Sequence, residues 1–201
     1  IEEVDANLGT VVTSSNQTIS PSLTAERFRS RAMNSTFAAT YFPDIETQNI
    51  ARGPATVFVP PSVGALKVYS RLNSEGNVAA PAGSIRGVIS SETGIRTKVQ
   101  FDDTQKTTIK ELYDVAINPI ITSADGLILF GQRTMFTSAE SMLQRISIRR
   151  MVIDIRRAVR QAAQFVVFEQ NTEKVLSDFQ ANLKPILTRF VRAGGISRFR
   201  V

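Results

Sequence analysis

Residues 117–134 read INPIITSADGLILFGQRT, and this stretch decides the fold. Two apolar runs, Ile120-Ile121 and Leu127–Phe130, flank the polar segment Ser123–Gly126. A short polar segment that contains Gly between two apolar runs is typical of a β-hairpin, because Gly accepts the positive φ angle that tight turns require. The stretch therefore predicts two paired strands.

A helix is predicted immediately before the hairpin. Between Thr104 and Ala116, the residues Ile109, Leu112, Tyr113 and Ala116 recur at the i, i+3, i+4, i+7 spacing of one helix face. We expect Asn118-Pro119 to end this helix.

The longest helical pattern follows the hairpin, from about Ile148 to Phe168. Its apolar residues fall within an arc roughly 140° wide on the helical wheel. Arg149, Arg156 and Arg160 lie opposite this arc, with Arg150 and Arg157 beside them. The pattern predicts an amphipathic helix with an arginine-rich face.

A third helix is predicted from Asn171, which is a good N-cap residue, to Gly194-Gly195, where Gly suits a C-cap. Pro185 should kink it. The last residues, 196–201, alternate apolar and basic and indicate the beginning of a strand.

The N-terminal third has shorter patterns. Residues 1–20 are small and polar and predict an extended arm, and Thr56–Val59 predicts a short strand. Ser62 is placed to cap a following helix. A break at Ala79–Gly83 places a domain boundary between about residues 71 and 84.

Composition indicates a soluble folded protein of one large or two small domains: 201 residues, 42% hydrophobic and 21% charged. There is no apolar run long enough for a membrane span. The absence of Cys and His excludes thiol and imidazole catalysis and the common metal sites. Asp102-Asp103 is the closest acidic pair, and we interpret it as a helix cap. We expect no enzymatic activity, no cofactor and no metal.

Positive charge is concentrated in the C-terminal part of the chain. The net charge is +6, but residues 126–201 carry 13 Lys or Arg against 5 Asp or Glu, whereas residues 1–125 carry 11 against 13. This asymmetry suggests a nucleic acid, an acidic surface or an acidic protein as the partner.

Several motifs occur in an order that resembles the C-terminal half of contractile phage tail sheath proteins. They are Tyr41-Phe42-Pro43, Pro60–Gly64, Tyr69–Leu72, Ala80-Pro81-Ala82-Gly83, Ile117-Asn118-Pro119, Gly126–Thr134, Arg145–Arg150 and Phe168-Glu169-Gln170-Asn171. The signature positions within them are Pro43, Pro81, Gly83, Asn118, Pro119, Gly126, Gly131, Arg133, Thr134, Arg150, Phe168, Glu169 and Asn171. The resemblance covers about residues 30–201, with Gln170 in place of the family's usual Pro and Phe130 in place of a common Trp.

The resemblance implies an α+β fold of mixed sheets flanked by helices. Residues 1–70 would form the end of a central domain with a subtilisin-like, non-proteolytic fold, and residues 71–201 a truncated C-terminal sheath domain. It also implies a structural subunit that packs helically around the tail tube and rearranges on contraction to drive the tube into the host envelope.

The partners implied by the resemblance are other sheath subunits, the tail tube protein, the baseplate and the tail terminator, with no membrane and no specific nucleic acid. The location implied is the virion tail, and the host cytoplasm during assembly. Because the family joins subunits through terminal arms that this sequence lacks, we expect the chain alone to be monomeric.

The arginines of the longest helix have three interpretations. Sequence alone favours a solvated polar face. With the inner position of the C-terminal domain in the family, we interpret Arg149, Arg156, Arg157 and Arg160 as a tube-facing surface. The alternative function is a basic nucleic-acid-binding module, because Arg suits phosphate, although no recognition motif accompanies the arginines. For Arg133 and Arg149 we favour a structural role, with carboxylates such as Asp125 as possible partners, and for Gly131 a turn.

Overall fold

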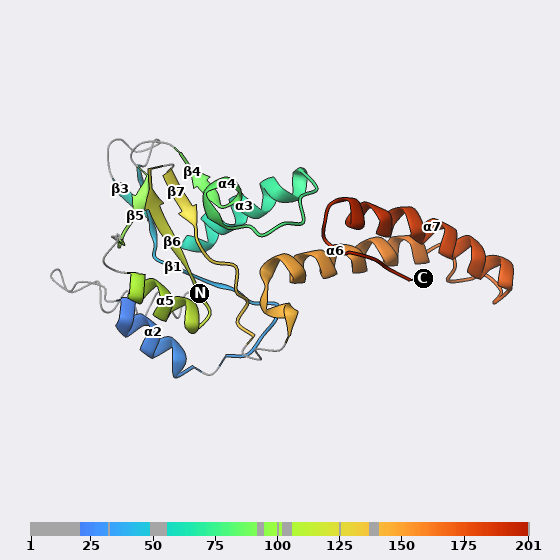
Figure 1. The fold of residues 1–201 in the computed structure, drawn as a ribbon, viewed down its shortest axis with the longest axis horizontal. Coiled ribbons are helices and arrows are strands. Elements are labelled where there is room, and N and C mark those ends of the chain that lie inside the picture. Colours follow the sequence, from blue (N-terminus) through green and yellow to red (C-terminus); the bar gives the residue numbers. More distant parts are fainter. Residues whose placement is uncertain are drawn as a thin grey trace.

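The computed structural model describes residues 21–31, 33–48, 56–91, 95–99, 101, 106–124, 126–136 and 141–200. The predictions for residues 1–20, Asp102-Asp103 and Asp125 lie outside these ranges. Figure 1 shows two parts, a body that contains the sheets and a helical arm that projects from it. We define the body as described residues 21–136 and the arm as α6 and α7.

The helices are α2 (Pro21–Arg29), α3 (Pro61–Ser74), α4 (Gly83–Arg86), α5 (Lys106–Asp114), α6 (Ile146–Ala163) and α7 (Glu173–Arg192), with the 3-10 helix η2 (Met142–Gln144) before α6. The strands are β1 (Thr40–Phe42), β2 (Ile45–Gln48), β3 (Thr56–Val59), β4 (Val88–Ser90), β5 (Arg96–Thr97), β6 (Ile117–Ser123) and β7 (Gly126–Leu129). The chain has the α+β fold that the resemblance implies, with helices flanking two sheets, of which the larger is mixed and the smaller antiparallel.

The predicted hairpin is the centre of the larger sheet, whose strand order is β1-β6-β7-β4. β6 and β7 pair antiparallel, with Ser123 opposite Gly126, while β1 lies parallel to β6. Gly126 has φ +109°, and a Cβ there would lie 2.3 Å from the Ser90 carbonyl oxygen of β4. The turn therefore requires Gly both for its backbone angle and for space.

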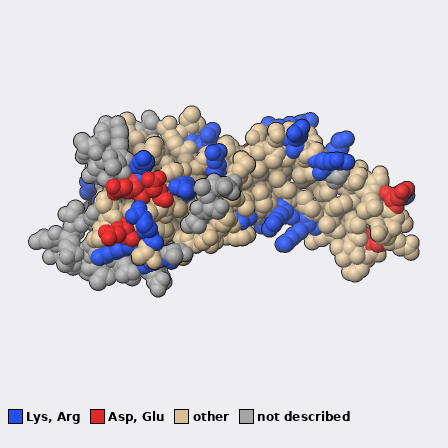
Figure 2. Space-filling view, turned by 60° about the horizontal axis from the view of Figure 1, so that its bottom comes forward, with Lys and Arg blue, Asp and Glu red and all other residues tan. Residues whose placement is uncertain are grey.

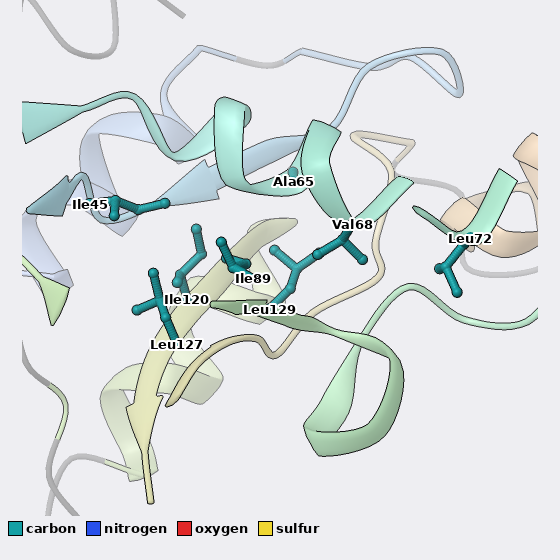
Figure 3. Packing of buried hydrophobic residues seen from close by; sticks show 8 residues of the cluster. All are labelled: Ile45, Ala65, Val68, Leu72, Ile89, Ile120, Leu127 and Leu129. Carbon is teal, nitrogen blue, oxygen red and sulfur yellow. The ribbon is translucent and has the colours of Figure 1, made fainter. Parts of the chain in front are cut away.

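The smaller sheet has the order β3-β2-β5, and its strand β3 confirms the prediction for Thr56–Val59. α3 packs against β1 and β4 of the larger sheet, over the main core. That core consists of Ile45, Ala65, Val68, Leu72, Ile89, Ile120, Leu127 and Leu129 (Figure 3). The apolar residues of α3 recur three and four residues apart, so one helix face covers strands from both sheets.

The helix expected at Ser62 begins one residue earlier, at Pro61, and no side chain caps it. The prediction of a Ser62 cap is wrong. Pro needs no hydrogen-bond partner for its nitrogen and has a φ angle suited to the first turn, so the helix starts without a cap.

A second core lies on the other side of the larger sheet, under α2 and α5 (Figure 1). It contains Phe28, Phe42, Leu112, Ile117 and Met135. Ile117 faces this core and Ile120 faces the main core, because side chains an odd number apart on a strand point to opposite faces. Strand β6 therefore separates the two cores.

The helix before β6 ends earlier than predicted, at Asp114, and Asn118-Pro119 does not end it. The reversal occurs at Ala116, which has φ +65°. Pro119 instead lies within β6, where its carbonyl accepts a hydrogen bond from the Phe130 N–H at 2.9 Å. The predicted boundary after residue 70 stays a proposal; the larger sheet takes β1 from one side of it and β6 from the other.

Candidate functional site

The arm carries most of the residues that the sequence marks as an interaction surface. α6 presents Met151 and α7 presents Leu183 and Phe190 as buried side chains. Phe190 is only 2% exposed. Gly195 packs next to Phe190 and Met151, so closely that a Cβ on Gly195 would lie 2.6 Å from the Met151 sulfur. α6 and α7 therefore form an antiparallel hairpin that packs along one side of each helix (Figure 1).

Both ends of α7 have specific caps. The Thr172 hydroxyl accepts a hydrogen bond from the Val175 N–H, so Thr172 is the N-cap and the prediction of Asn171 is wrong by one residue. At the other end, the Gly194 N–H donates to Val191 and the Gly195 N–H donates to Phe190, with Gly194 at φ +72°. This is a Schellman motif, and it confirms the predicted glycine cap.

The first turn of α6 fixes the arm to the body through Arg149. This side chain is only 9% exposed; its Nε donates to the Thr36 carbonyl at 3.1 Å and its Nη2 to the Thr36 hydroxyl. Its guanidinium lies 3.8 Å from the centre of the Phe37 ring. Arg149 is therefore buried and is not part of the predicted tube-facing surface. Its contacts agree with the predicted structural role.

Arg150 points to the other side of the same turn. Its Nη2 donates to the Asn73 side chain of α3, and its guanidinium lies 5.1 Å from the centre of the Tyr69 ring. Tyr69 in turn shares a hydrogen bond with Tyr41 of β1. Burial raises the pKa of both tyrosines and lowers the pKa of Arg150. Local sequence patterns do not indicate this half-buried cluster, because its members are far apart along the chain.

The remaining arginines of α6 are exposed and separate into two groups. Arg156 and Arg160 are four residues apart and share one helix face, and Arg157 lies about 100° from Arg156 and about 60° from Arg160. Arg157 lines a hollow between α6, α7 and the end of α3, together with Arg189. In Figure 2, basic side chains lie along both the upper and the lower edge of the arm. In the described part of the chain, none of these four arginines forms an ion pair within 4.0 Å.

Asn118 connects the signature residues of the body. Its side-chain amide donates to the carbonyls of Thr40 and Arg133 at 3.0 and 2.8 Å, and its oxygen accepts from the Arg133 N–H at 2.6 Å. A Cβ on Gly131 would lie 2.6 Å from that oxygen. Gly131 therefore serves close packing against Asn118 rather than the predicted turn.

The other signature residues have separate positions. The Arg133 guanidinium donates to the Tyr113 carbonyl at 2.9 Å, and the Thr134 hydroxyl donates to the Leu143 carbonyl at 2.9 Å. Thus the observed partner of Arg133 is a backbone carbonyl; the suggested Asp125 lies outside the described residues. Pro43 and Pro81 are fully buried, and Gly83 has φ +85°. Phe168, Glu169 and Asn171 are exposed at the far end of the arm.

The described residues contain no group of three acidic side chains placed to hold a metal ion. Within the same residues, no helix has both the length and the apolar character of a membrane span.

Comparison with known proteins identifies the relatives of this chain. It is 32% identical over 123 residues to the tail sheath protein of Vibrio phage KVP40 and 31% identical over 123 residues to that of Enterobacteria phage T4. The chain is a relative of the phage tail sheath proteins. Each alignment covers 61% of this chain but only 17% and 18% of those proteins, so the chain spans a minor part of their length.

A solved structure supports the relationship at the level of the fold. The cryo-EM structure of the anti-feeding prophage baseplate contains a chain that matches this one with a TM-score of 0.66 and 26% identity. The match covers 83% of this sheath relative and 42% of the solved chain. No protein-family profile matches the sequence.

Proposed function

We propose that the chain is part of a structural, non-enzymatic subunit of a contractile tail sheath. The similarity to two tail sheath proteins at 31–32% identity is the observation that carries this proposal. In this role the subunit packs helically around the tail tube, contacts other sheath subunits, the baseplate and the tail terminator, and rearranges on contraction. Its location is the virion tail, after assembly in the host cytoplasm.

The tube-facing surface that we propose is narrower than the sequence suggests. Arg156 and Arg160 are exposed, lie on one face of α6 and form no ion pair among the described residues. Unpaired arginines in a row attract an acidic surface over several ångströms before contact. Arg149 is buried, and Arg157 lines the hollow between α6 and α7. We therefore assign the contact to a basic ridge formed by Arg156 and Arg160.

Charge reversal of the basic ridge tests this assignment. In the full-length protein, Arg156→Glu with Arg160→Glu should weaken sheath assembly on purified tail tubes several-fold, because attraction becomes repulsion. The loss should be larger at low salt than at high salt, where screening shortens the range of the interaction. Assembly is measured by co-sedimentation with the tubes and by electron microscopy.

A matched control reverses two exposed charges on the body, Lys67 of α3 and Lys110 of α5. This Lys67→Glu, Lys110→Glu variant has the same net charge as the ridge variant and should assemble normally. Normal assembly of the ridge variant at low salt would contradict the tube-facing role. Equal losses in both variants would show that net charge alone controls assembly.

A further inference from the structure

The arm carries a groove whose lining does not include Arg156 or Arg160. It consists of two adjoining hollows of about 630 and 310 Å³ that share Ala158, Gln161 and Arg189. The first lies between α6 and α7, and the second continues to the end of α3 at Leu72 and Asn73. The shared residues make the two hollows one continuous surface, which we call the arm groove.

The two ends of the arm groove differ in chemistry. Near the body it is lined by Arg157 and Arg189, with Asp154 as the acidic residue of that end. Toward the far end of the arm it is lined by the apolar side chains of Ala162, Phe165 and Ile186. Arg189 lies against the Phe190 ring, 5.4 Å from its centre, which helps to fix its direction. A fitting occupant has apolar side chains next to carboxylates.

The far end of the arm has the complementary chemistry. Phe168 is 98% exposed, and Val167 and Leu176 are also exposed. Glu169 and Glu173 lie exposed among them, and Figure 2 shows acidic side chains at this end of the arm. We call these five residues the arm tip. Such a cluster of large exposed apolar side chains marks a contact site.

We propose that the arm tip of one copy of this chain docks in the arm groove of a second copy. Phe168 and Leu176 would cover the apolar end of the groove, and Glu169 and Glu173 would approach Arg157 and Arg189. The single contact explains two independent observations, the uncovered apolar tip and the unpaired arginines of the groove. A nucleic acid fits less well, because the groove has an apolar floor and contains Asp154, whereas phosphate contacts need a continuous basic strip.

The proposed contact is heterologous, since the tip and the groove are different surfaces of the same arm. A heterologous contact leaves one free tip and one free groove on every dimer, so it continues into rings or filaments. The chain should therefore associate with increasing concentration, in contrast to the expectation of a monomer. This inference deepens the proposed sheath role by assigning one contact between subunits, but it does not depend on the tail tube.

Charge swapping tests the contact. A groove variant, Arg157→Glu with Arg189→Glu, and a tip variant, Glu169→Arg with Glu173→Arg, should each lose self-association, with the apparent affinity lowered about tenfold or more. When the two variants are mixed, the acidic groove of one faces the basic tip of the other, and the unchanged acidic tip of the first faces the unchanged basic groove of the second. Association should therefore return, with the two variants alternating in equal amounts. Sedimentation velocity measures all three samples.

The control is the Arg156→Glu, Arg160→Glu variant, which changes the net charge as much as the groove variant but at residues that do not line the groove. It should self-associate like the wild type. Circular dichroism confirms that each variant is folded, and Phe168→Ser, which changes only an exposed side chain, should weaken association without any change of charge.

Three outcomes would overturn the proposal. The first is a wild-type chain that stays monomeric up to about 1 mM, the weak end of specific binding. The second is self-association of the groove variant or the tip variant that is as strong as that of the wild type. The third is a mixture of the two variants in which association does not return. Because no tube is present, failure here leaves the assembly test of the basic ridge unaffected.

Discussion

Asn118 shows how much of the body depends on a single polar side chain. It is fully buried, and its amide makes three hydrogen bonds that join β1, β6 and the segment after β7. The amide has two donors and an acceptor directed to three backbone groups, an arrangement that neither Asp nor Leu reproduces. The buried Asn is therefore satisfied, and its backbone partners depend on it.

We expect Asn118→Ala to lower the free energy of unfolding by about 3 kcal/mol or more, since it leaves three backbone groups unpaired at roughly 1–3 kcal/mol each. Chemical denaturation measures the change. The control is Asn171→Ala, at the exposed position that the sequence suggested as a helix cap, which should change stability by less than about 0.5 kcal/mol. A loss below about 1 kcal/mol for Asn118→Ala would mean that water replaces the amide.

Arg149 and Arg156 show what the sequence pattern can and cannot predict at the residue scale. Both lie on the polar face of α6, as the helical spacing indicates, yet Arg149 is buried and Arg156 is exposed. The difference comes from Thr36 and Phe37, which lie 113 and 112 positions earlier in the chain. Helical periodicity gives the direction of a side chain but not the distant segment that covers it.

At the scale of elements, the connection between arm and body depends on the adjacent residues Arg149 and Arg150. Arg149 holds the segment before β1, and Arg150 holds α3 through Asn73 and Tyr69. The start of α6 is also held by the Ile146 N–H, which donates to the Gln132 carbonyl at 2.9 Å. Two guanidinium groups that leave one helical turn about 100° apart and bind different segments of the body restrict both tilt and rotation of the arm.

Loss of this double attachment should widen the range of arm orientations. The chain contains no Cys, so spin labels can be attached through Ser70→Cys in α3 and Ser177→Cys in α7, both at exposed positions. Pulsed electron resonance should give a narrow distance distribution for the otherwise unchanged chain and a broader one for Arg149→Gln with Arg150→Gln. Arg156→Gln is the control and should leave the distribution unchanged. An equally narrow distribution in the double variant would show that the backbone connection alone fixes the arm.

The elements themselves were predicted to different degrees, for physical reasons. The β6–β7 hairpin and α6 follow from short-range patterns, and the structure confirms both. The prediction that Pro119 ends a helix was wrong. Residue 119 belongs to strand β6, because it pairs with the parallel strand β1, and this pairing joins residues 77 positions apart. The strand expected from Ile196 does not form, because no strand in the described part of the chain pairs with residues 196–200. Local sequence patterns contain no information about strand-pairing partners that are distant in the sequence.

The interaction surfaces were predicted less completely than the elements. The excess of arginine correctly marks the arm as the basic part, but Arg189 was not singled out, because it comes from α7 and meets Arg157 only through the packing of the two helices. The exposed arm tip was likewise missed, since the helix was predicted to run to about Phe168, whereas α6 ends at Ala163. The spacing of apolar residues does not show where along its length a helix stops packing against a neighbouring helix.

For the whole molecule, the distribution of buried residues indicates two regions of unequal stability. Strands β6 and β7 lie between two cores, and Ile117, Ile120, Leu127 and Leu129 are almost completely buried. In contrast, Leu183 and Phe190 are the buried residues of the 20-residue helix α7. Elements with few buried apolar contacts open at a lower free energy than the core.

We therefore expect Phe190→Ala to unfold the arm while the body stays folded. Removal of a buried Phe costs roughly 3–5 kcal/mol, and in the arm few other buried side chains offset that loss. Hydrogen exchange measured by mass spectrometry should show lost protection in α7 and unchanged protection in β6 and β7. The control, Leu129→Ala, removes a side chain from the main core and should lower protection in both regions, because the arm is attached to the body through segments that the core holds in place. If Phe190→Ala lowered protection equally in β6 and α7, the chain would unfold as one unit. The arm would then have no unfolding equilibrium of its own that contact with a neighbouring subunit could shift.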